Sequence, residues 1–460
     1  MHGMNMKRAF SSFLCVVLAV AAPLAPAMAT QLPFTVSLNR EIAAVSAAGG
    51  GRVTVPVGRH ESGLIELKSN VELHLPVGCE IVGSEDFGAY PLMPGGPTPS
   101  QKDVNGWTAL VFASGATNIA LTGFGAIDGR GGAQKANSRF GGKGYDTDGR
   151  ARNILFVSCR GVTVRDVTLR SPAMWNQHYF DCEDVLIEGV RVFARVNYNN
   201  DGLDIDSCRR VTVRNCTIDS SDDAIVFKST SRAPCEDVLV ENCMLSSQAT
   251  ALKFGTESVG SFRRFRIRNL TIRPSAIPTP WTHPGFVTNG IAAVEVSTVD
   301  GGDVEDVDID GVDAVGCASA IFLRVGNRGR PMRPGEKGLP PGFMRHVRIA
   351  NVKARGIGNL GSSVSTFEEG RISGVRLENI SIETVGGIRA GDYLDEAKFK
   401  DKVSGFPSPL HLGKLPAKGL FQRNAKDVEV VGFAFSSQLP DVRPERMVSE
   451  GLNGPKGPAY

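Results

Sequence analysis

A short motif of alternating apolar and polar positions recurs along most of the chain. It reads apolar-x-apolar, two residues, then apolar-x-apolar again, as in VTVRDVTL at Val162 and VTVRNCTI at Val211. A period of two is typical of β-strands, whose successive side chains point to opposite faces. Each motif therefore predicts two short strands. The motif, or its first half, begins at Ile119, Val162, Val185, Val211, Val238, Phe265, Val307, Val347, Val375 and Val428.

The spacing of these motifs indicates a repeat architecture. From Val162 to Phe265 the successive intervals are 23, 26, 27 and 27 residues. A fixed period of this size is a signature of solenoids, and short strands separated by Asn, Gly and Asp favour a parallel β-helix over a helical array. Successive coils would then pair at about 4.8 Å. A β-sandwich with chance periodicity is the alternative, and ten recurrences disfavour it.

The later and terminal parts of the chain depart from this regular spacing. Residues 38–48 have helix-like apolar spacing before three glycines, which predicts a helix that caps the open first coil. The Pro- and Gly-containing residues 274–289 and 327–343 are expected to be long loops that form cleft walls. The composition of residues 441–460 predicts an irregular tail. We therefore expect one all-β domain, a parallel β-helix with an N-terminal capping helix, over residues 30–440.

Residues 1–29 have the pattern of a secretory signal peptide. Lys7 and Arg8 precede a short apolar run, and Ala27-Met28-Ala29 matches a cleavage site. The run is too short to span a membrane. These features predict a periplasmic or secreted protein, cleaved near Ala29, with no membrane span.

Charge and cysteine content narrow the function classes. Without Lys7 and Arg8 the chain has 49 basic residues against 48 acidic ones, so it lacks the general positive charge expected of a nucleic-acid-binding protein. Six cysteines recur at the coil spacing, which predicts stacked interior columns of apolar fillers, with disulfides between coils as the alternative. They are Cys159, Cys182, Cys208, Cys235, Cys216 and Cys243.

Two clusters of aspartates fall on successive coils. They are Asp201, Asp204 and Asp206, followed by Asp222 and Asp223. Strand alternation places Asp222 on the outer face, whereas a perfect strand would turn Asp201 and Asp223 inward. These two reach the outer face only where the chain bends, which Gly202 and the run Ser220-Ser221 allow.

The same face is predicted to carry Lys228 and, one coil later, Lys253 and Glu257. A glycosidase needs a protonated carboxyl and a carboxylate across the cleaved bond, about 6.5–9.5 Å apart for inversion. Acids on adjacent coils can meet that range, since the coils are about 4.8 Å apart and the side chains are also offset laterally. Clustered carboxylates raise one another's pKa and so supply the acid form. The pattern therefore predicts glycoside hydrolysis.

At these residues the chain resembles the polygalacturonase-like glycoside hydrolases of family 28, which are right-handed parallel β-helices. Asn199-Asn200-Asp201-Gly202 is similar to the family's Asn-Thr-Asp-Gly motif, and Asp222-Asp223 is similar to its Asp-Asp motif. The resemblance implies that Asp222 is the general acid and that Asp201 and Asp223 activate the hydrolytic water. It places Asn199 among the substrate-binding residues and implies no metal and no cofactor.

Two family motifs are missing from this chain. The family's Gly-His-Gly falls on Ala249-Thr250-Ala251, and its Arg-Ile-Lys, which holds the substrate carboxylate, falls near Ala293–Ser297, where no Lys or Arg occurs. Substrate-binding candidates that could supply the missing groups are Lys228, Lys253, Arg324 and His178. Surface ladder charges and a satisfied strand histidine are the structural alternatives for these residues.

The leading hypothesis is an exported, inverting glycoside hydrolase that acts on a pectic or related, uronate-containing polysaccharide or oligosaccharide. The missing motifs favour exo action or a rhamnogalacturonan-type substrate. Trp175 and Trp281 are candidates for stacking against sugar rings. One alternative is a β-helical polysaccharide lyase that uses a carboxylate cluster with calcium and a basic side chain. Another is a carbohydrate-binding β-helix without catalysis.

Overall fold

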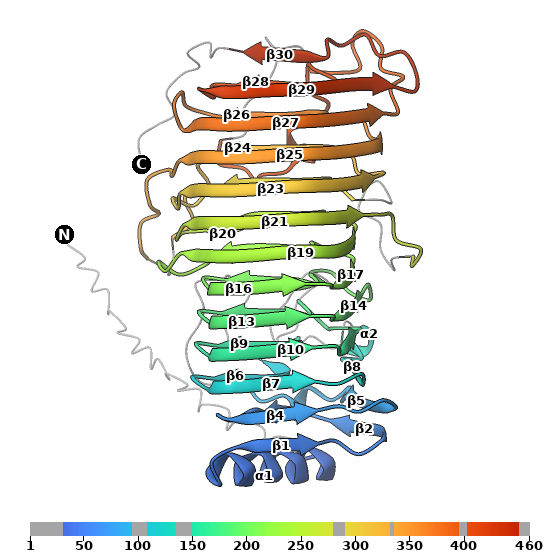
Figure 1. Ribbon diagram of the computed structural model, residues 1–460, viewed down its shortest axis with the longest axis vertical. Coiled ribbons are helices and arrows are strands. Elements are labelled where there is room, and N and C mark those ends of the chain that lie inside the picture. The colour runs from blue at the N-terminus through green and yellow to red at the C-terminus, as the bar shows by residue number, and fades with distance from the viewer. Residues whose placement is uncertain are drawn as a thin grey trace, which may run out of the picture.

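The computed structural model describes residues 31–93, 108–134, 150–278, 290–331, 335–394 and 403–449. These residues form a right-handed parallel β-helix, in which coils stack along the long axis of the molecule (Figure 1). The motif positions predicted from the sequence pair in register, as in Val162 with Val185, Val185 with Val211 and Val211 with Val238. The predicted solenoid is therefore confirmed.

The strands belong to two parallel sheets. Within the described ranges, the smaller sheet has 12 strands and the larger has 18. The smaller sheet contains β3 (Ile65–Glu66), β6 (Ala109–Ser114), β9 (Arg152–Val157), β12 (Gln177–Phe180), β15 (Leu203–Asp206), β18 (Ile225–Ser229), β20 (Thr250–Ser258), β22 (Ala292–Thr298), β24 (Ser319–Val325), β26 (Ser362–Thr366), β28 (Leu420–Arg423) and β30 (Arg446–Ser449). The larger contains β1 (Gly51–Thr54), β2 (Gly58–Ser62), β4 (Val71–His74), β5 (Cys79–Gly83), β7 (Thr117–Thr122), β8 (Ala126–Asp128), β10 (Arg160–Arg165), β11 (Thr168–Arg170), β13 (Glu183–Glu188), β14 (Arg191–Ala194), β16 (Arg209–Arg214), β17 (Thr217–Ser220), β19 (Cys235–Ser247), β21 (Phe262–Ile272), β23 (Val304–Val315), β25 (Met344–Ile357), β27 (Ile372–Thr384) and β29 (Val428–Ser437).

One continuous apolar core fills the inside of the coils. The predicted cysteine columns contribute to it, and every cysteine in the part of the chain that the structure describes is a buried free thiol. Cys182, for example, is 1 % exposed, and its amide donates to the sulfur of Cys208 on the next coil. Small, weakly polar thiols fill the interior without disulfide bonds.

The two ends of the solenoid differ from the predicted boundaries. Helix α1 (Pro33–Ala47) covers the first coil and buries Leu38 and Ile42 (Figure 1). It begins before residue 38 because proline fits the first turn of a helix, where its missing N–H has no partner to lose. The prediction of an irregular tail from residue 441 is wrong for Arg446–Ser449, because β30 pairs with β28 and extends the smaller sheet by one more coil.

Three short helical segments interrupt the coils: η1 (Phe87–Ala89), α2 (Gly131–Gln134) and α3 (Pro409–Leu412). None of the helices in the described ranges is both long and apolar enough to cross a membrane. The predicted signal peptide, Trp281 and parts of the two predicted loops, residues 279–289 and 332–334, lie outside the described residues.

Candidate active site

The middle of the smaller sheet carries charged side chains on the face that points away from the core. All are at most 5 % exposed, although they lie outside the apolar interior. Burial of this kind removes the charges from water, so each one depends on its neighbours for stabilisation. The residues at these outward positions are Asp204, Asp206, Lys228, Lys253, Glu295 and Arg324.

Asp201 and Asp223 occupy equivalent places on two neighbouring coils, just before β15 and β18 begin. Leu203 pairs with Ile225, and the amide of Gly202 donates to the carbonyl of Asp223 at 2.9 Å. Strand alternation does not apply before the first strand residue, so both aspartates escape the inward orientation that a perfect strand would impose. Gly202 is required here, because an added Cβ would lie 2.3 Å from Ile218. The bend expected from the sequence is present.

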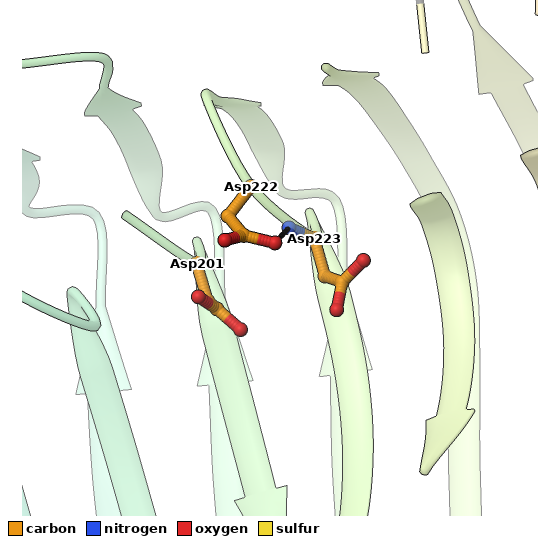
Figure 2. A group of neighbouring side chains, drawn as sticks. All are labelled: Asp201, Asp222 and Asp223. Atoms are coloured by element: carbon orange, nitrogen blue, oxygen red, sulfur yellow. Dashed lines mark hydrogen bonds between the residues drawn. The ribbon is translucent and has the colours of Figure 1, made fainter. Parts of the chain in front are cut away.

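Asp222 joins these two residues to form the acid cluster, defined as Asp201, Asp222 and Asp223. One carboxylate oxygen from each lies within 4.8 Å of the others, and the amide of Asp223 donates to Asp222 Oδ1 at 3.0 Å (Figure 2). Asp201 and Asp223 are 3 % exposed, whereas Asp222 is more accessible. These oxygens are closer than the about 6.5–9.5 Å expected between the carboxyls of an inverting enzyme.

Lys253 and Thr250 engage both oxygens of Asp223. The Lys253 ammonium donates to Asp223 Oδ2 at 2.9 Å, and the Thr250 amide donates to Oδ1 at 3.0 Å. The backbone of the threonine found in place of the family's histidine thus binds one of the acids. The side chains of Lys253 and Asp223 are 6 % and 5 % exposed. Burial opposes the charge of Lys253, but the neighbouring carboxylates keep its pKa above the usual range.

Lys228 has a similar role beside Asp201. Its ammonium is 3.9 Å from Asp201, 3.5 Å from Asp204 and 3.4 Å from Glu257. It also lies 4.6 Å from the centre of the Trp175 ring. Burial opposes its charge, but the surrounding carboxylates raise its pKa above the ordinary lysine value, so Lys228 stays protonated.

Two members of the acid cluster hold protons more tightly than free aspartates do. Burial, assisted by the charge of Asp223, raises the pKa of Asp222 to about 6. Burial and the charges of Asp204 and Asp222 raise the pKa of Asp201 as well. Groups this close titrate as a unit, with one carboxyl keeping its proton when the others ionise. The cluster therefore supplies an acid and a carboxylate at mildly acidic pH.

The predicted residue Glu257 links Lys228 to a second set of charges. Its carboxylate contacts Arg330 at 3.2 Å, and Arg328 pairs with the buried Asp300. Burial opposes its ionisation, but Lys228, Arg328 and Arg330 hold the pKa of Glu257 below its usual range. Glu257 is therefore a permanent anion that supports the Lys228 charge.

Two residues of the Asn-Asn-Asp-Gly motif have different environments. Asn200 is fully buried, where its side chain accepts from the amides of Val196 and Asn197 and donates to the carbonyls of Pro172 and Met174. Asn199 is partly exposed, and Arg150 donates to its side chain at 3.3 Å. Asn200 therefore shapes the turn, and Asn199 is the member that can reach a substrate.

Two further predicted residues are deeply buried. His178 has no exposed surface and lies 3.3 Å from Asp206, as in the alternative of a satisfied strand histidine. Trp175 is 3 % exposed, and Lys228 and Arg152 both lie against its ring. Arg324 is 3 % exposed and donates to Ser365 at 3.3 Å, two coils beyond Lys253 on the same outer face.

Sequence reasoning missed two neighbours of the acid cluster. Glu295 pairs in register with Lys253 and is 1 % exposed. Phe406, far along the chain, places its ring centre 4.9 Å from the Lys253 ammonium and is 44 % exposed. The alternation of apolar and polar residues in VEVST, residues 294–298, predicts that Glu295 points outward. Phe406 follows no repeat, so no comparable signal could have identified it.

Comparisons with known proteins agree with this architecture. Residues 46–272 match the family model described as "Glycosyl hydrolases family 28". The chain is 30% identical over 197 residues to a probable polygalacturonase of Vitis vinifera, covering 41% of this chain and 39% of that protein. It is 27% identical to an exo-poly-alpha-D-galacturonosidase of Dickeya chrysanthemi, covering 39% of this chain and 36% of the other. The matches thus span less than half the length of these relatives.

The fold is also similar to that of a solved structure, the family 28 exopolygalacturonase of Yersinia enterocolitica. The TM-score is 0.64 at 16% identity, covering 90% of this chain and 75% of that one. At this identity the likeness shows the fold. The acid cluster, Lys228, Lys253 and Glu257 lie inside the matched residues 46–272, whereas Glu295, Arg324 and Phe406 lie beyond them.

Proposed function

We propose that this chain, which belongs to the polygalacturonase-like glycosyl hydrolases of family 28 through residues 46–272, hydrolyses glycosidic bonds of a pectic, uronate-containing polysaccharide or oligosaccharide. The observation that carries the proposal is the acid cluster, whose most accessible member, Asp222, has a pKa raised to about 6. A carboxyl that keeps its proton at mildly acidic pH can donate it to the leaving oxygen. Asp222 is the proposed general acid.

Asp201 and Asp223 are the proposed holders of the hydrolytic water. A water that donates to two acceptors at about 2.7–2.8 Å bridges oxygens up to roughly 5.5 Å apart, and the cluster's oxygens are within 4.8 Å. Within the described residues, Asp201 Oδ1 accepts no hydrogen bond, so it can orient such a water. Attack by this water inverts the configuration at the anomeric carbon.

Exo action is the proposed mode of cleavage. The polar stretch of the smaller sheet ends on one side at an apolar group that contains Phe112, Leu155 and Val157. On the other side it ends at Phe322, which packs against Leu412 and other residues that return from the C-terminal part of the chain. From β9, which carries Leu155 and Val157, to β24, which carries Phe322, there are six strand spacings, roughly 29 Å. A polar stretch bounded at both ends fits the end of a sugar chain.

A lyase is the second candidate, because Asp201, Asp222 and Asp223 are also close enough to share a metal ion. Its basic residue would have to be a neutral lysine, yet the pKa values of Lys228 and Lys253 are both raised. Hydrolysis is therefore favoured.

One digestion experiment separates these reactions. Hydrolysis of pectic oligosaccharides should yield saturated products from one chain end, unchanged by a chelator, and NMR of the first product should show the inverted anomer. Unsaturated products that absorb in the ultraviolet, lost on adding a chelator, would establish the lyase instead. Retention of configuration would reject the proposed role of the water while keeping hydrolysis.

Export is proposed from the signal-peptide pattern of residues 1–29. N-terminal sequencing of protein from the extracellular or periplasmic fraction should begin near Thr30. An intact Met1 in the mature protein would contradict export by this route.

A further inference from the structure

Glu295 is a buried carboxyl on the same outer face as the acid cluster. Thr250 Oγ1 donates to one of its oxygens at 3.3 Å and Ser297 Oγ to the other at 3.2 Å. Thr250 also donates its amide to Asp223. Glu295 is therefore fixed in position, and Thr250 links it to Asp223, a proposed catalytic residue.

Both lysines near Glu295 are already paired with carboxylates. Lys253 is held at 2.9 Å by Asp223 and faces Glu295 across the strand pair. Lys228 is shared by Asp201, Asp204 and Glu257. Among the described residues, the cations are these two ammonium groups, Arg328 and Arg330 beside Glu257, and Arg152 near Asp204. They face six carboxyls, if Asp222 is counted with the five already named, so carboxyls outnumber cations by one. In a buried site, this imbalance opposes any further anion.

The side of Glu295 that faces away from the acid cluster is apolar. Glu295 pairs in register with Phe322, which packs against Leu412, Leu415 and Phe421. The half-exposed Phe406 ring lies against Lys253. The next outward position on β24 is Arg324, which donates to Ser365. A group bound beside Lys253 and the exposed part of the Phe406 ring therefore meets aromatic surface.

We infer that the sugar bound beside Lys253 and Phe406 carries no charge at C6, and that Glu295 determines this selectivity. The substrate class is then a methyl-esterified uronate or a 6-deoxy sugar next to the cleaved bond, whose terminal methyl group can contact the Phe406 ring. This inference rests on the proposed hydrolytic function and narrows its substrate.

The selectivity has a pH dependence with a defined sign. Burial raises the pKa of Glu295 to about 7, with Asp223 adding to the effect and Lys253 opposing it. Below that pH the carboxyl is neutral and repels a substrate carboxylate less. Above it, Glu295 is ionised and the repulsion is greatest, so discrimination against charged sugars rises with pH. Loss of the Asp222 proton, centred near pH 6, removes the general acid for both substrates alike, and the new charge changes the ratio mainly below the pH at which Glu295 ionises.

The test compares kcat/KM for methyl-esterified and free-acid oligogalacturonides of one length, and for rhamnogalacturonan oligosaccharides, between pH 5 and 8. We expect uncharged substrates to be favoured at least tenfold at pH 8, with a smaller ratio at pH 5. Preference among the uncharged substrates distinguishes the methyl ester from the 6-deoxy sugar.

Glu295→Gln keeps the shape of the side chain and should give a smaller ratio that no longer changes between pH 7 and 8. Glu295→Lys should reverse the preference, and a thermal melt checks that each variant folds. Glu305→Gln, at a partly exposed position on β23 that pairs with Arg263, is the matched control and should match the unmodified protein.

The outcomes separate the inference from the function on which it rests. Equal or better cleavage of the free acid at every pH, unchanged in Glu295→Gln, overturns the inference and leaves hydrolysis standing. A ratio that still changes between pH 7 and 8 in Glu295→Gln also overturns it, because another group must then be responsible. Cleavage of no pectic substrate at all overturns the proposed function itself.

Discussion

Ion pairs stack from coil to coil on both sheets of this protein, but in different surroundings. On the larger sheet, Arg264 is 2.6 Å from Asp237, and the two side chains are 49 % and 41 % exposed. On the smaller sheet, Lys253 is 2.9 Å from Asp223, and these side chains are 6 % and 5 % exposed. The separations and the stacking are alike, so burial is the main difference.

That difference changes the acid strength of the aspartates. On the larger sheet, the hydrogen bond from Arg264 lowers the pKa of Asp237. On the smaller sheet, burial raises the pKa of Asp222 to about 6 despite two nearby lysines. An exposed pair stays ionised and inert, whereas a buried cluster retains a proton that it can donate. We therefore expect catalysis on the smaller sheet, where the charged side chains are buried.

Removing the acid from the buried cluster should have the largest effect. Asp222→Asn is expected to lower kcat by about two to four orders of magnitude, since the amide cannot transfer a proton. Steady-state assays on pectic oligosaccharides, with a circular dichroism spectrum for folding, provide the measurement. Asp237→Asn on the larger sheet is the control and should keep full activity. Near-normal turnover of Asp222→Asn would remove Asp222 from the mechanism.

Breaking the buried pair should also destabilise the fold. Lys253→Met leaves Asp223 buried without its cation, and losing one partner of such a pair costs about 3–5 kcal/mol. Denaturant unfolding measures the change, with Lys353→Met at an exposed position of β25 as the control. A loss below about 1 kcal/mol, the range of exposed pairs, would mean that Asp223 finds other compensation.

The pH profile tests the raised pKa of the buried cluster directly. As pH rises through about 6, Asp222 loses the proton that the general acid must donate. Activity measured as kcat/KM should therefore fall about tenfold per pH unit well above that value. Activity that stays constant up to pH 8 would show that the essential acid has a higher pKa than Asp222.

The exposed pair should give the smallest effect. Arg264→Ala removes contacts to Glu236 and Asp237, which are worth less than about 1 kcal/mol because water and salt screen them. The same unfolding measurement should show a small change that shrinks further in high salt. A loss as large as that of Lys253→Met would contradict the distinction between the two sheets.

The sequence predicted much of the fold because the repeat is local. Strand alternation and a fixed interval determine which residues face inward and which coils pair, as for Val162 and Val185. The same spacing placed Asp201 near Asp222 and Asp223. It could not predict how deeply His178 and Trp175 are buried, since burial depends on contacts between residues far apart in the sequence. It also could not foresee β30, whose sequence lacks the motif.

By itself, the sequence determined the solenoid, its register and the acids that successive coils bring together, because stacking follows from spacing along the chain. Only the tertiary structure decided which charges are buried and what completes the site. Phe406 reaches Lys253 from about 150 residues away along the chain, and the pKa of Glu295 depends on its burial and on the charges of Lys253 and Asp223. The physical reason is that the pKa of a carboxyl depends on its solvation and neighbours, which no spacing rule specifies.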